Sequence, residues 1–380
     1  MKKSLIALAV IAASGAAMAQ SSVTLYGLID VSVQSAKLQT FSNLNAAGVA
    51  TTVVTGPSAV TQTRMQSGGQ NGSRWGMKGV EDLGGGLNAV FDLQSGFTVD
   101  NGASAQGGLL FGRHAFVGLN SASLGALTFG RHDTPLDDMI GDILPSKHNS
   151  FDVTAGTGLT SASAAAIQAF YTAAAPTIAQ TTAYVAAINA MSSNTYAWVG
   201  YNSRADNSIK YTSANYAGFK VSALYSLGEN KTATVGATHT ASVATEYANG
   251  PVTAVLAYQE EVLSKTATSS TSLKNTLFGA AYDFGVVKLY GAVNEAKYTG
   301  VAKQKEYALG VTVPVGAFTL RAEAAQSKGD FLGKSTGYDL EALYDLSKRS
   351  TLYTSFSTSK KEYMANARSR VAAVGIRHTF

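Results

Sequence analysis

The strongest constraint on the fold is the regular alternation of apolar and polar residues that runs to the end of the chain. In residues 370–380, every second residue counted back from the aromatic terminus is mostly apolar, and the residues between are small or polar. Because a strand places alternate side chains on opposite faces, this segment predicts a strand with one apolar and one polar face. Such a strand is typical of a membrane barrel with lipid outside and water inside. The apolar face carries Ala372, Val374, Ile376, His378 and Phe380, and the other carries Ala373, Gly375, Arg377 and Thr379.

The same alternation flanks seven short turns, most of them marked by glycine. Each turn joins two alternating segments, so the repeating unit is a β-hairpin. The last five turns lie 31 to 35 residues apart. Tyrosine and phenylalanine tend to end the apolar faces, where an interfacial aromatic girdle belongs. The turns are at residues 82–86, 123–125, 215–218, 249–251, 284–285, 315–316 and 346–348.

Counting these hairpins predicts an all-β fold, a transmembrane antiparallel β-barrel of about 16 strands. Seven hairpins supply fourteen strands, and the first and last strands complete the set. The other connections are longer and uneven, at residues 37–71, 101–110 and 135–195. Short turns at one end and long loops at the other are characteristic of membrane barrels. A soluble β-sandwich also alternates, but its strands need not reach the roughly ten residues of a tilted membrane strand. A barrel of this size encloses water.

The first nineteen residues have the three parts of a secretory signal. Lys2 and Lys3 give a positive start, residues 5–13 are apolar, and residues 17–19 read Ala-Met-Ala, a small-x-small cleavage site. The expected organisation is therefore a signal peptide at 1–19 and one barrel domain at 20–380. No later stretch reaches the roughly 20 apolar residues of a membrane helix.

Composition and motifs argue against several other functions. The chain has 380 residues, no cysteine and only 14% charged residues, and its net charge of +5 includes two lysines of the signal, so nothing points to nucleic acid. The five histidines lack metal-ligand spacing, and Gly333-Lys334-Ser335 lacks the earlier glycine of a phosphate-binding loop, since Lys328 stands there. No Gly-x-Ser-x-Gly motif occurs. We expect no catalytic residues, no metal, no other cofactor and no enzyme activity.

Several segments, taken in order, resemble the general porins of Gram-negative outer membranes, of the type common in β-proteobacteria. The start, VTLYGLID at 23–30, is similar to the family's first strand, and SRWGMKGVEDLG at 73–84 to its second strand and first turn. Further similar segments are FVGL at 116–119, LTFGR at 127–131, NSIKY at 207–211 and the terminal Phe380, the family's membrane-assembly signature. The chain departs from the family at His378, where tyrosine is usual. Its third loop is longer, richer in alanine and without the familiar Pro-Glu-Phe-Gly-Gly core.

The resemblance implies a homotrimer of barrels in the cell outer membrane, surrounded by lipid, with the long third loop folded into each pore. Basic wall residues then face acidic loop residues across a constriction. Carried over by position, the wall residues are Arg74, Arg131 and Arg204, and the loop residues are Asp137, Asp138 and Asp142. Lys78 shares the parity of Arg74 and is expected to face the lumen. Arg131 shares the parity of Leu127 and Phe129, so a bulge or bend after Gly130 is needed to turn it inward.

The function expected from the resemblance is passive diffusion of small hydrophilic solutes and ions, with a mild preference for anions. Opposed charges across a narrow channel set ion preference. The alternative is an outer-membrane channel specific for a sugar, amino acid or organic acid, although Tyr26 and Tyr290 alone do not make a binding track. The Ala-rich segment at 161–191 favours helix, interrupted by Pro176, and is either part of the constriction or a surface insertion.

Overall fold

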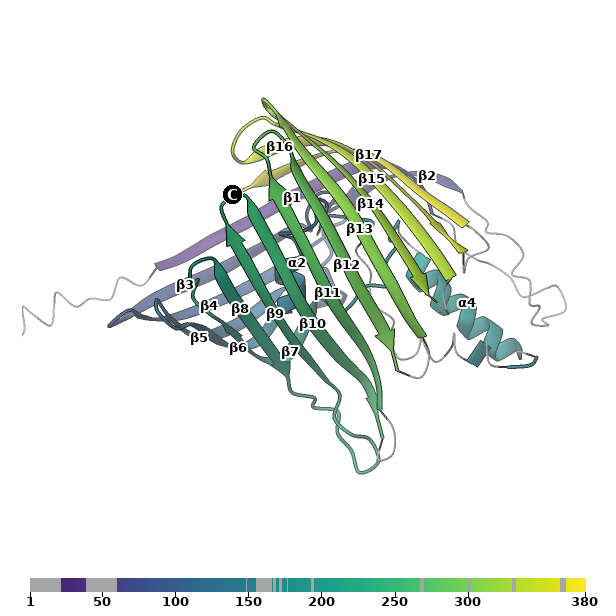
Figure 1. Ribbon diagram of the computed structural model, residues 1–380, viewed down its shortest axis with the longest axis horizontal. Helices are drawn as coiled ribbons and strands as arrows, with labels where there is room; N and C mark the ends of the chain where they lie inside the picture. The colour runs from purple at the N-terminus through teal and green to yellow at the C-terminus, as the bar shows by residue number, and fades with distance from the viewer. Residues whose placement is uncertain are drawn as a thin grey trace, which may run out of the picture.

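The protein is a closed antiparallel β-barrel with a polar interior (Figure 1). The computed structural model describes residues 22–38, 60–147, 149–154, 166, 169–170, 173–175, 177–192, 195–266, 270–299, 302–329, 333–362 and 367–380. The expected signal peptide at 1–19 lies outside them. The strands are β1 (Ser22–Lys37), β2 (Thr61–Ser67), β3 (Arg74–Gly84), β4 (Leu87–Gly96), β5 (His114–Ser121), β6 (Gly125–Asp133), β7 (Arg204–Thr212), β8 (Phe219–Ser226), β9 (His239–Asn249), β10 (Val252–Lys265), β11 (Ser270–Asp283), β12 (Lys288–Tyr298), β13 (Ala302–Val315), β14 (Phe318–Gly329), β15 (Gly333–Asp345), β16 (Ser350–Lys361) and β17 (Ala367–Thr379).

The described part of the chain contains seventeen labelled strands, which make sixteen barrel strands because β2 and β3 are two halves of one. Both halves pair with β1, β2 along residues 31–37 and β3 along residues 22–28. Each remaining strand pairs with its neighbour in sequence, and β17 pairs with β1 to close the ring. The sixteen-stranded barrel predicted from the sequence is confirmed, and all seven predicted short turns join consecutive strands.

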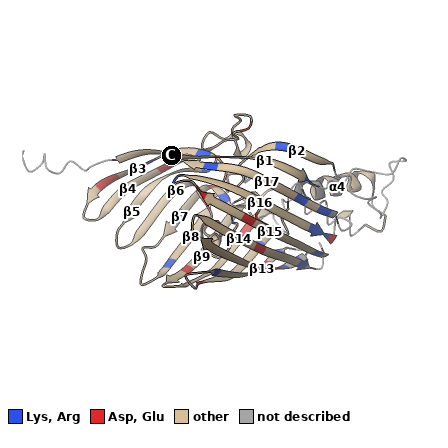
Figure 2. Cartoon of the chain, turned by 90° about the horizontal axis from the view of Figure 1, so that it is seen from above, with Lys and Arg blue, Asp and Glu red and all other residues tan. Residues whose placement is uncertain are grey.

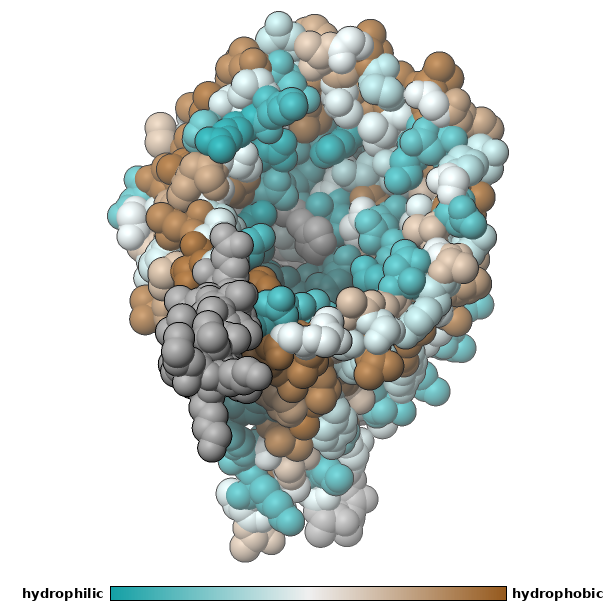
Figure 3. All heavy atoms as spheres, turned by 90° about the vertical axis from the view of Figure 1, so that its left-hand side faces the viewer, coloured by the Kyte–Doolittle hydropathy of each residue, from teal (hydrophilic) through white to brown (hydrophobic). Residues whose placement is uncertain are grey.

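Side chains alternate between a buried inward set and an exposed outward set, as the parity of the sequence predicts. On β13, for example, Leu309 is 70% exposed and its neighbour Ala308 is buried. Figure 3, which looks along the barrel from the short-turn end, shows an opening lined with hydrophilic residues and apolar residues around its outer rim. Ring pairs on the outer face beside the short turns form an aromatic girdle. They are Phe219 with Tyr247, Tyr282 with Phe284, and Phe318 with Tyr344.

The last residue extends the pairing of β17 with β1 that closes the barrel. Phe380 donates its backbone N–H to the Gly27 carbonyl at 3.0 Å and accepts the Gly27 N–H at 3.1 Å. The ring also lies over Gly27, where a Cβ atom would come within 2.3 Å of Phe380 Cζ. Glycine is therefore required at this position of β1 for the terminal ring to pack against the first strand.

The second barrel strand is interrupted at residues 68–73 because the buried Asp30 carboxylate holds that segment inside the barrel. Its Oδ1 accepts the Gly69 N–H at 3.1 Å, and its Oδ2 accepts the N–H groups of Gln70 and Asn71, each at 2.8 Å. The Tyr353 hydroxyl donates to Oδ1 at 2.6 Å. Residues 68–73 thus leave the sheet and reach into the lumen with the N–H groups of Gly69, Gln70 and Asn71 satisfied.

Replacing Asp30 by alanine should destabilise the barrel, because three buried N–H groups and one hydroxyl would lose their acceptor. We expect the free energy of unfolding to fall by about 3 kcal/mol. The matched control is Ser32→Ala, at the next inward position on β1. Its hydroxyl donates to the Gln66 carbonyl at 3.4 Å and accepts from Gln34 Nε2 at 3.1 Å, and its loss should cost about 1 kcal/mol. Denaturant unfolding in micelles measures both changes. Equal losses in the two variants would contradict this account of the interruption.

The long third loop, between β6 and β7, enters the lumen at Thr134. It starts with the helix α2 (Pro135–Ile140), which is capped by Thr134 and packs against β8, β9 and β10. The Ala-rich segment forms the helix α4 (Ile178–Ser192) at the long-loop end of the barrel, beyond the strands (Figure 1). A short 3-10 helix, η1 (Gln106–Gly108), lies between β4 and β5. Among the described residues, no helix is long and apolar enough to cross a membrane.

Candidate functional site

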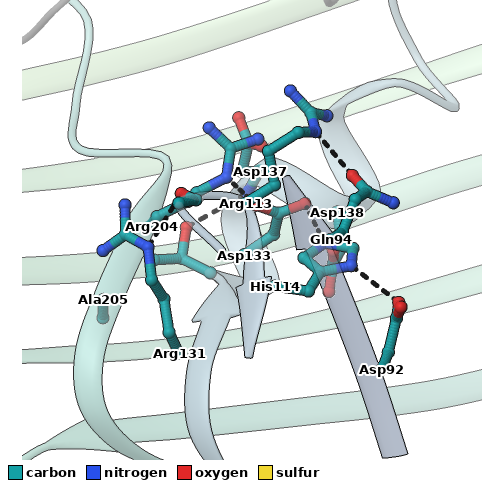
Figure 4. Close-up of polar contacts among 12 residues, drawn as sticks. Asp92, Gln94, Arg113, His114, Arg131, Asp133, Asp137, Asp138, Arg204 and Ala205 are labelled. Atoms are coloured by element: carbon teal, nitrogen blue, oxygen red, sulfur yellow. Dashed lines mark hydrogen bonds and ion pairs between the residues drawn. The ribbon is translucent and has the colours of Figure 1, made fainter. Parts of the chain in front are cut away.

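A polar cavity of about 570 Å³ lies in the lumen between the wall formed by β3 to β7 and the third loop. It is the place where wall cations meet loop residues, and Figure 4 shows several of its charged groups. Its lining includes four cationic side chains and two carboxylates. The cationic residues are Arg74, Arg113, Lys147 and Arg204, and the carboxylates are Asp133 and Asp137.

The three arginines come from three different parts of the wall. Arg74 begins β3 and donates to the Gly72 carbonyl at 3.0 Å, so the inserted segment 68–73 orients it. Arg113, just before β5, donates from Nε to Gln94 Oε1 at 2.5 Å. Arg204 begins β7, and its Nε lies 2.6 Å from Asp133 Oδ1. Each guanidinium is therefore held by one polar contact while the rest of the group borders the cavity.

A chain of polar contacts crosses the wall beside this cluster. His114 lies between two carboxylates, with Nδ1 2.9 Å from Asp92 Oδ2 and Nε2 2.9 Å from Asp133 Oδ2. The Tyr26 hydroxyl donates to Asp92 Oδ1 at 2.5 Å and accepts from Gln94 Nε2 at 2.8 Å. This chain fixes the orientation of Asp133, which in turn fixes Arg204.

The predicted loop carboxylates occupy three different environments. Asp137 is buried, borders the cavity and accepts the Tyr201 hydroxyl at 2.9 Å. Asp138 is exposed in the lumen and is paired with Lys210. Asp142 is exposed farther along the loop and does not line the cavity. The structure therefore brings only Asp137 of these three to the arginine cluster.

Two predicted wall residues do not line this cavity. Lys78 faces the lumen, with Nζ 5.3 Å from the centre of the Tyr26 ring, but it lies four residues, about 13 Å, from Arg74 towards the short turns. For Arg131, the predicted inward turn is wrong. It pairs with Ala115, on the outward side of β5, and binds Asp206 at 2.5 Å and the Gly112 carbonyl at 2.8 Å.

The expected irregularity after Gly130 exists, but the extra residue lies in β7. Between two paired positions, β6 has only Arg131, whereas β7 has Asp206 and Asn207. Asn207 has a φ of 51°, a left-handed conformation that asparagine tolerates. Arg131 keeps the outward parity of Phe129, while the chain beyond it turns His132 and Asp133 inward.

Reasoning from sequence missed Arg113, His114, Asp133, Lys147 and Tyr201. Arg113 and His114 follow a predicted loop, and Lys147 lies inside the third loop, so parity along a strand does not place them. Lys147 lies with Nζ 5.0 Å above the Tyr201 ring and 3.9 Å from Asp152 Oδ2. The Arg-His pairs at 113–114 and 131–132 are the sequence signal that could have directed attention to this wall.

The pKa values of two cavity residues outside the strands, Arg113 and Asp137, favour a net positive charge in the cavity. Burial, with nearby Arg204 and Arg74, lowers the pKa of Arg113 to about 10, which leaves it cationic at neutral pH. Burial raises the pKa of Asp137, and repulsion by Asp133 adds to this, while Lys147, Arg204 and the Tyr201 hydroxyl act in the opposite direction. The loop carboxylate is thus weakened as an acid while the wall cations keep their charge.

Five carboxylates on the inner wall hold the third loop in place. Their oxygens accept hydrogen bonds from backbone or side-chain groups of the loop, and the distances range from 2.5 to 3.3 Å. The pairs are Glu261 with Asn202, Glu306 with Val199, Glu323 and Asp339 with Ser146, and Glu341 with Asn149.

Apolar loop side chains also pack directly on wall glycines. A Cβ atom at Gly279 would lie 2.1 Å from Ile143 Cδ1, and one at Gly310 would lie 2.6 Å from both Cδ and Cγ of Pro145. A Cβ atom at Gly337 would likewise lie 2.8 Å from Val153 Cβ. The loop is therefore seated against β11, β13 and β15, on the side of the barrel across from the arginines.

Within the described ranges, no group of three or more histidine, cysteine or acidic side chains is arranged to hold a metal ion. The cavity instead combines a polar lining with charges of both signs. Such an arrangement can attract and orient small charged solutes as they pass.

Comparison with known proteins identifies the family. A family model described as Gram-negative porin matches residues 5–362. The chain is a Gram-negative porin. An outer membrane porin protein of Bordetella pertussis is 29% identical over 431 residues and covers 100% of both chains. Outer membrane porin protein 32 of Delftia acidovorans is 32% identical over 376 residues, which cover 95% of this chain and 90% of the relative.

A solved structure shares the fold of this porin. The anion-selective porin from Comamonas acidovorans superposes with a TM-score of 0.68 at 24% identity, covering 95% of this chain and 100% of the other. The porin described here is an outer-membrane channel for passive diffusion of small hydrophilic solutes. These matches favour a general porin over the solute-specific channel left open by the sequence.

Proposed function

We propose that the pore prefers small anions, and that the cavity lined by Arg74, Arg113, Lys147 and Arg204 is its selectivity site. The observation that carries this is the charge of the lining, four cations against two carboxylates. Asp133 is engaged by Arg204 and His114, and Asp137 by Tyr201, so both carboxylates are already partnered within the protein. Arg204 pairs with Asp133 and Lys147 with Asp152, whereas Arg74 and Arg113 have no carboxylate within ion-pair distance among the described residues. Charged rings in a pore set its ion preference.

The proposal predicts an anionic reversal potential in planar bilayers under a potassium chloride gradient. The expected sign is that of chloride moving more easily than potassium, and the preference should weaken as salt rises, because the Debye length is about 10 Å at 0.1 M and about 3 Å at 1 M. The Comamonas acidovorans porin of this fold is anion-selective, but the proposal for this chain depends on its own residues. A reversal potential of the opposite sign at low salt would refute it.

Further features of the porin belong to this proposal. We infer a homotrimer in the outer membrane, export by a signal peptide at 1–19, and an assembly role for Phe380, whose closing contacts with Gly27 support that role. We also infer that the protein transports without catalysing a reaction and uses no cofactor. Chemical cross-linking of the detergent-solubilised protein tests the trimer, since a single band at the monomer mass would contradict it.

A further inference from the structure

His114 contacts a carboxylate through each nitrogen of its ring. Nδ1 lies 2.9 Å from Asp92 Oδ2, and Nε2 lies 2.9 Å from Asp133 Oδ2. A neutral imidazole has one N–H donor and one lone pair, whereas an imidazolium has two donors. One of the two contacts therefore needs a further proton, either on the ring or on a carboxylate.

The hydrogen bonds on the Asp92 side have a fixed direction. The Arg113 guanidinium can only donate, and its Nε lies 2.5 Å from Gln94 Oε1, so this atom of Gln94 is the amide oxygen. Gln94 Nε2 then donates to the Tyr26 hydroxyl oxygen at 2.8 Å, and the hydroxyl donates to Asp92 Oδ1 at 2.5 Å. Asp92 is thus an acceptor on this side, as an ionised carboxylate is.

Asp133 is held as an anion from its other side. The Arg204 Nε lies 2.6 Å from Asp133 Oδ1, and a guanidinium stays cationic in proteins. The Lys210 ammonium donates to the backbone carbonyl of Asp133 at 2.9 Å, which places a second positive charge nearby. A proton on the Asp133 carboxylate would weaken its attraction to both cations.

The extra proton therefore belongs to the ring. Each carboxylate already accepts a donor or faces a cation through its second oxygen, and such contacts favour the ionised form. In model peptides histidine also binds a proton more strongly than aspartate, by roughly two to three pKa units. Both ring nitrogens of His114 then donate, and the side chain carries a positive charge.

His132 on the next strand shows the opposite case. Its ring stacks on Phe116 with 4.8 Å between the ring centres, and its Nδ1 lies 2.8 Å from Ser208 Oγ. The Ser208 hydroxyl donates to the Gly130 carbonyl at 2.8 Å, so it accepts from the Nδ1–H of His132. Nε2 has no hydrogen-bond partner among the described residues. These contacts require one ring proton only, so they leave His132 neutral.

Only one of these two histidines borders the cavity. His114 is part of the cavity lining, whereas His132 is buried and lies outside it. Figure 4 shows His114 in the same cluster as the wall arginines. Charged residues are sparse along the strands (Figure 2), so one additional cation at this cavity changes its charge appreciably.

Charged and titratable groups from several elements surround the ring and the cavity that it borders. They are Tyr26 on β1, Arg74 on β3, Asp92 on β4, Arg113 before β5, His132 and Asp133 on β6, Arg204 and Lys210 on β7, and Asp137, Lys147, Tyr196 and Tyr201 on the third loop. With His114 as an imidazolium, a fifth cation joins the four other cations of the lining, against two carboxylates.

We propose that His114 is a specificity-determining residue of the pore, an imidazolium whose charge adds to that of the wall arginines and whose two N–H groups hold Asp92 and Asp133. The ring compensates the charge of these carboxylates, so that the guanidinium groups of Arg74 and Arg113 act on passing anions. The protonation state follows from the contacts of the ring alone, whereas the effect on selectivity rests on the proposed anion preference.

The protonation state is tested by nitrogen-15 NMR of the histidine-labelled porin in detergent micelles at pH 7. Both ring nitrogens of His114 should give the signal of a protonated nitrogen, whereas His132 should give one protonated and one unprotonated signal. His114→Lys, which keeps the charge, and His132→Gln assign the signals by their disappearance. An unprotonated ring nitrogen on His114 at pH 7 would overturn the proposal.

The effect on selectivity is tested by reversal potentials in dilute potassium chloride at pH 7. His114→Gln removes one positive charge, which at about 6 Å in water changes the permeability of each ion roughly threefold, against chloride and in favour of potassium. His114→Lys keeps the charge and should retain the wild-type preference. The matched control His132→Gln should also behave like the wild type, because it removes a neutral ring. Wild-type selectivity in His114→Gln, or an equal loss in His114→Lys, would overturn the proposal.

The pH profile separates the charge of the ring from a purely structural role. The anion preference of the wild type should follow the nitrogen-15 titration of His114 and fall as the ring loses its proton with rising pH. In His114→Lys the preference should stay level between pH 6 and pH 9, and in His114→Gln it should be level and lower. A wild-type preference that stays constant while the His114 signal titrates would overturn the role in selectivity.

The outcomes also distinguish this inference from the proposed function. A wild-type pore that prefers cations would refute the anion preference, while the NMR signal still tests the imidazolium. A wild-type pore that prefers anions and is unaffected by His114→Gln would refute only the specificity role of His114.

Discussion

Replacing Arg74 by glutamate should convert the pore from anion preference to cation preference. Arg74 donates to the Gly72 carbonyl and forms no ion pair with another described residue, so its charge acts mainly on the cavity. The substitution changes that charge by two units. At about 6 Å in water each unit is worth about 0.7 kcal/mol to a monovalent ion, so the total is about 1.4 kcal/mol, or roughly tenfold for each ion, unfavourable for the anion and favourable for the cation. Reversal potentials in dilute potassium chloride measure this change.

The matched control is Lys78→Glu, on the same strand and the same lumen-facing side. It makes an identical charge change about 13 Å from Arg74, beyond a Debye length of about 10 Å at 0.1 M salt. We therefore expect a much smaller shift in reversal potential. If Lys78→Glu changed selectivity as much as Arg74→Glu, selectivity would be a property of the whole lumen, and the cavity would lose its special role.

The barrel could be predicted from the sequence because its determinants are local. The alternation of apolar and polar residues and the glycine-marked turns can each be recognised within the sequence of a single hairpin. Each predicted turn joins the two strands that flank it in the sequence. The parity that places Arg74 and Lys78 in the lumen also comes from a few neighbouring residues, here Trp75 and Met77 on the opposite face. Local patterns of this kind do not depend on distant parts of the chain.

The selectivity site was only partly predictable, because it is assembled from contacts between distant segments. Arg131 remains outside since β7, more than seventy residues later, supplies the extra residue of the bulge. Arg113 enters the site through Gln94 on another strand. Asp142 lies away from the arginines because the loop residues that follow it, Ile143 and Pro145, pack on Gly279 and Gly310 of the opposite wall. No local sequence pattern predicts these contacts.

The packing of the third loop against the barrel wall should determine the conductance of the channel, and Gly310→Leu should disturb this packing strongly. A Cβ atom at this position already lies 2.6 Å from the Pro145 ring, so a leucine cannot fit while the loop stays in place. The loop would be pushed away from β13 towards the axis of the pore. We expect a lower single-channel conductance, with a stability loss of about 1–3 kcal/mol from overpacking.

Gly291→Leu on the adjacent strand provides the control for Gly310→Leu. A Cβ atom at Gly291 meets only Leu309 Cδ2, at 3.6 Å, which is an ordinary contact on the outer face. The same substitution there should leave conductance and stability close to those of the wild type. Because both variants add one leucine to neighbouring strands, only displacement of the loop distinguishes them. Wild-type conductance in Gly310→Leu would mean that the loop adapts without narrowing the pore. The contacts between loop side chains and wall glycines would then not determine the pore diameter.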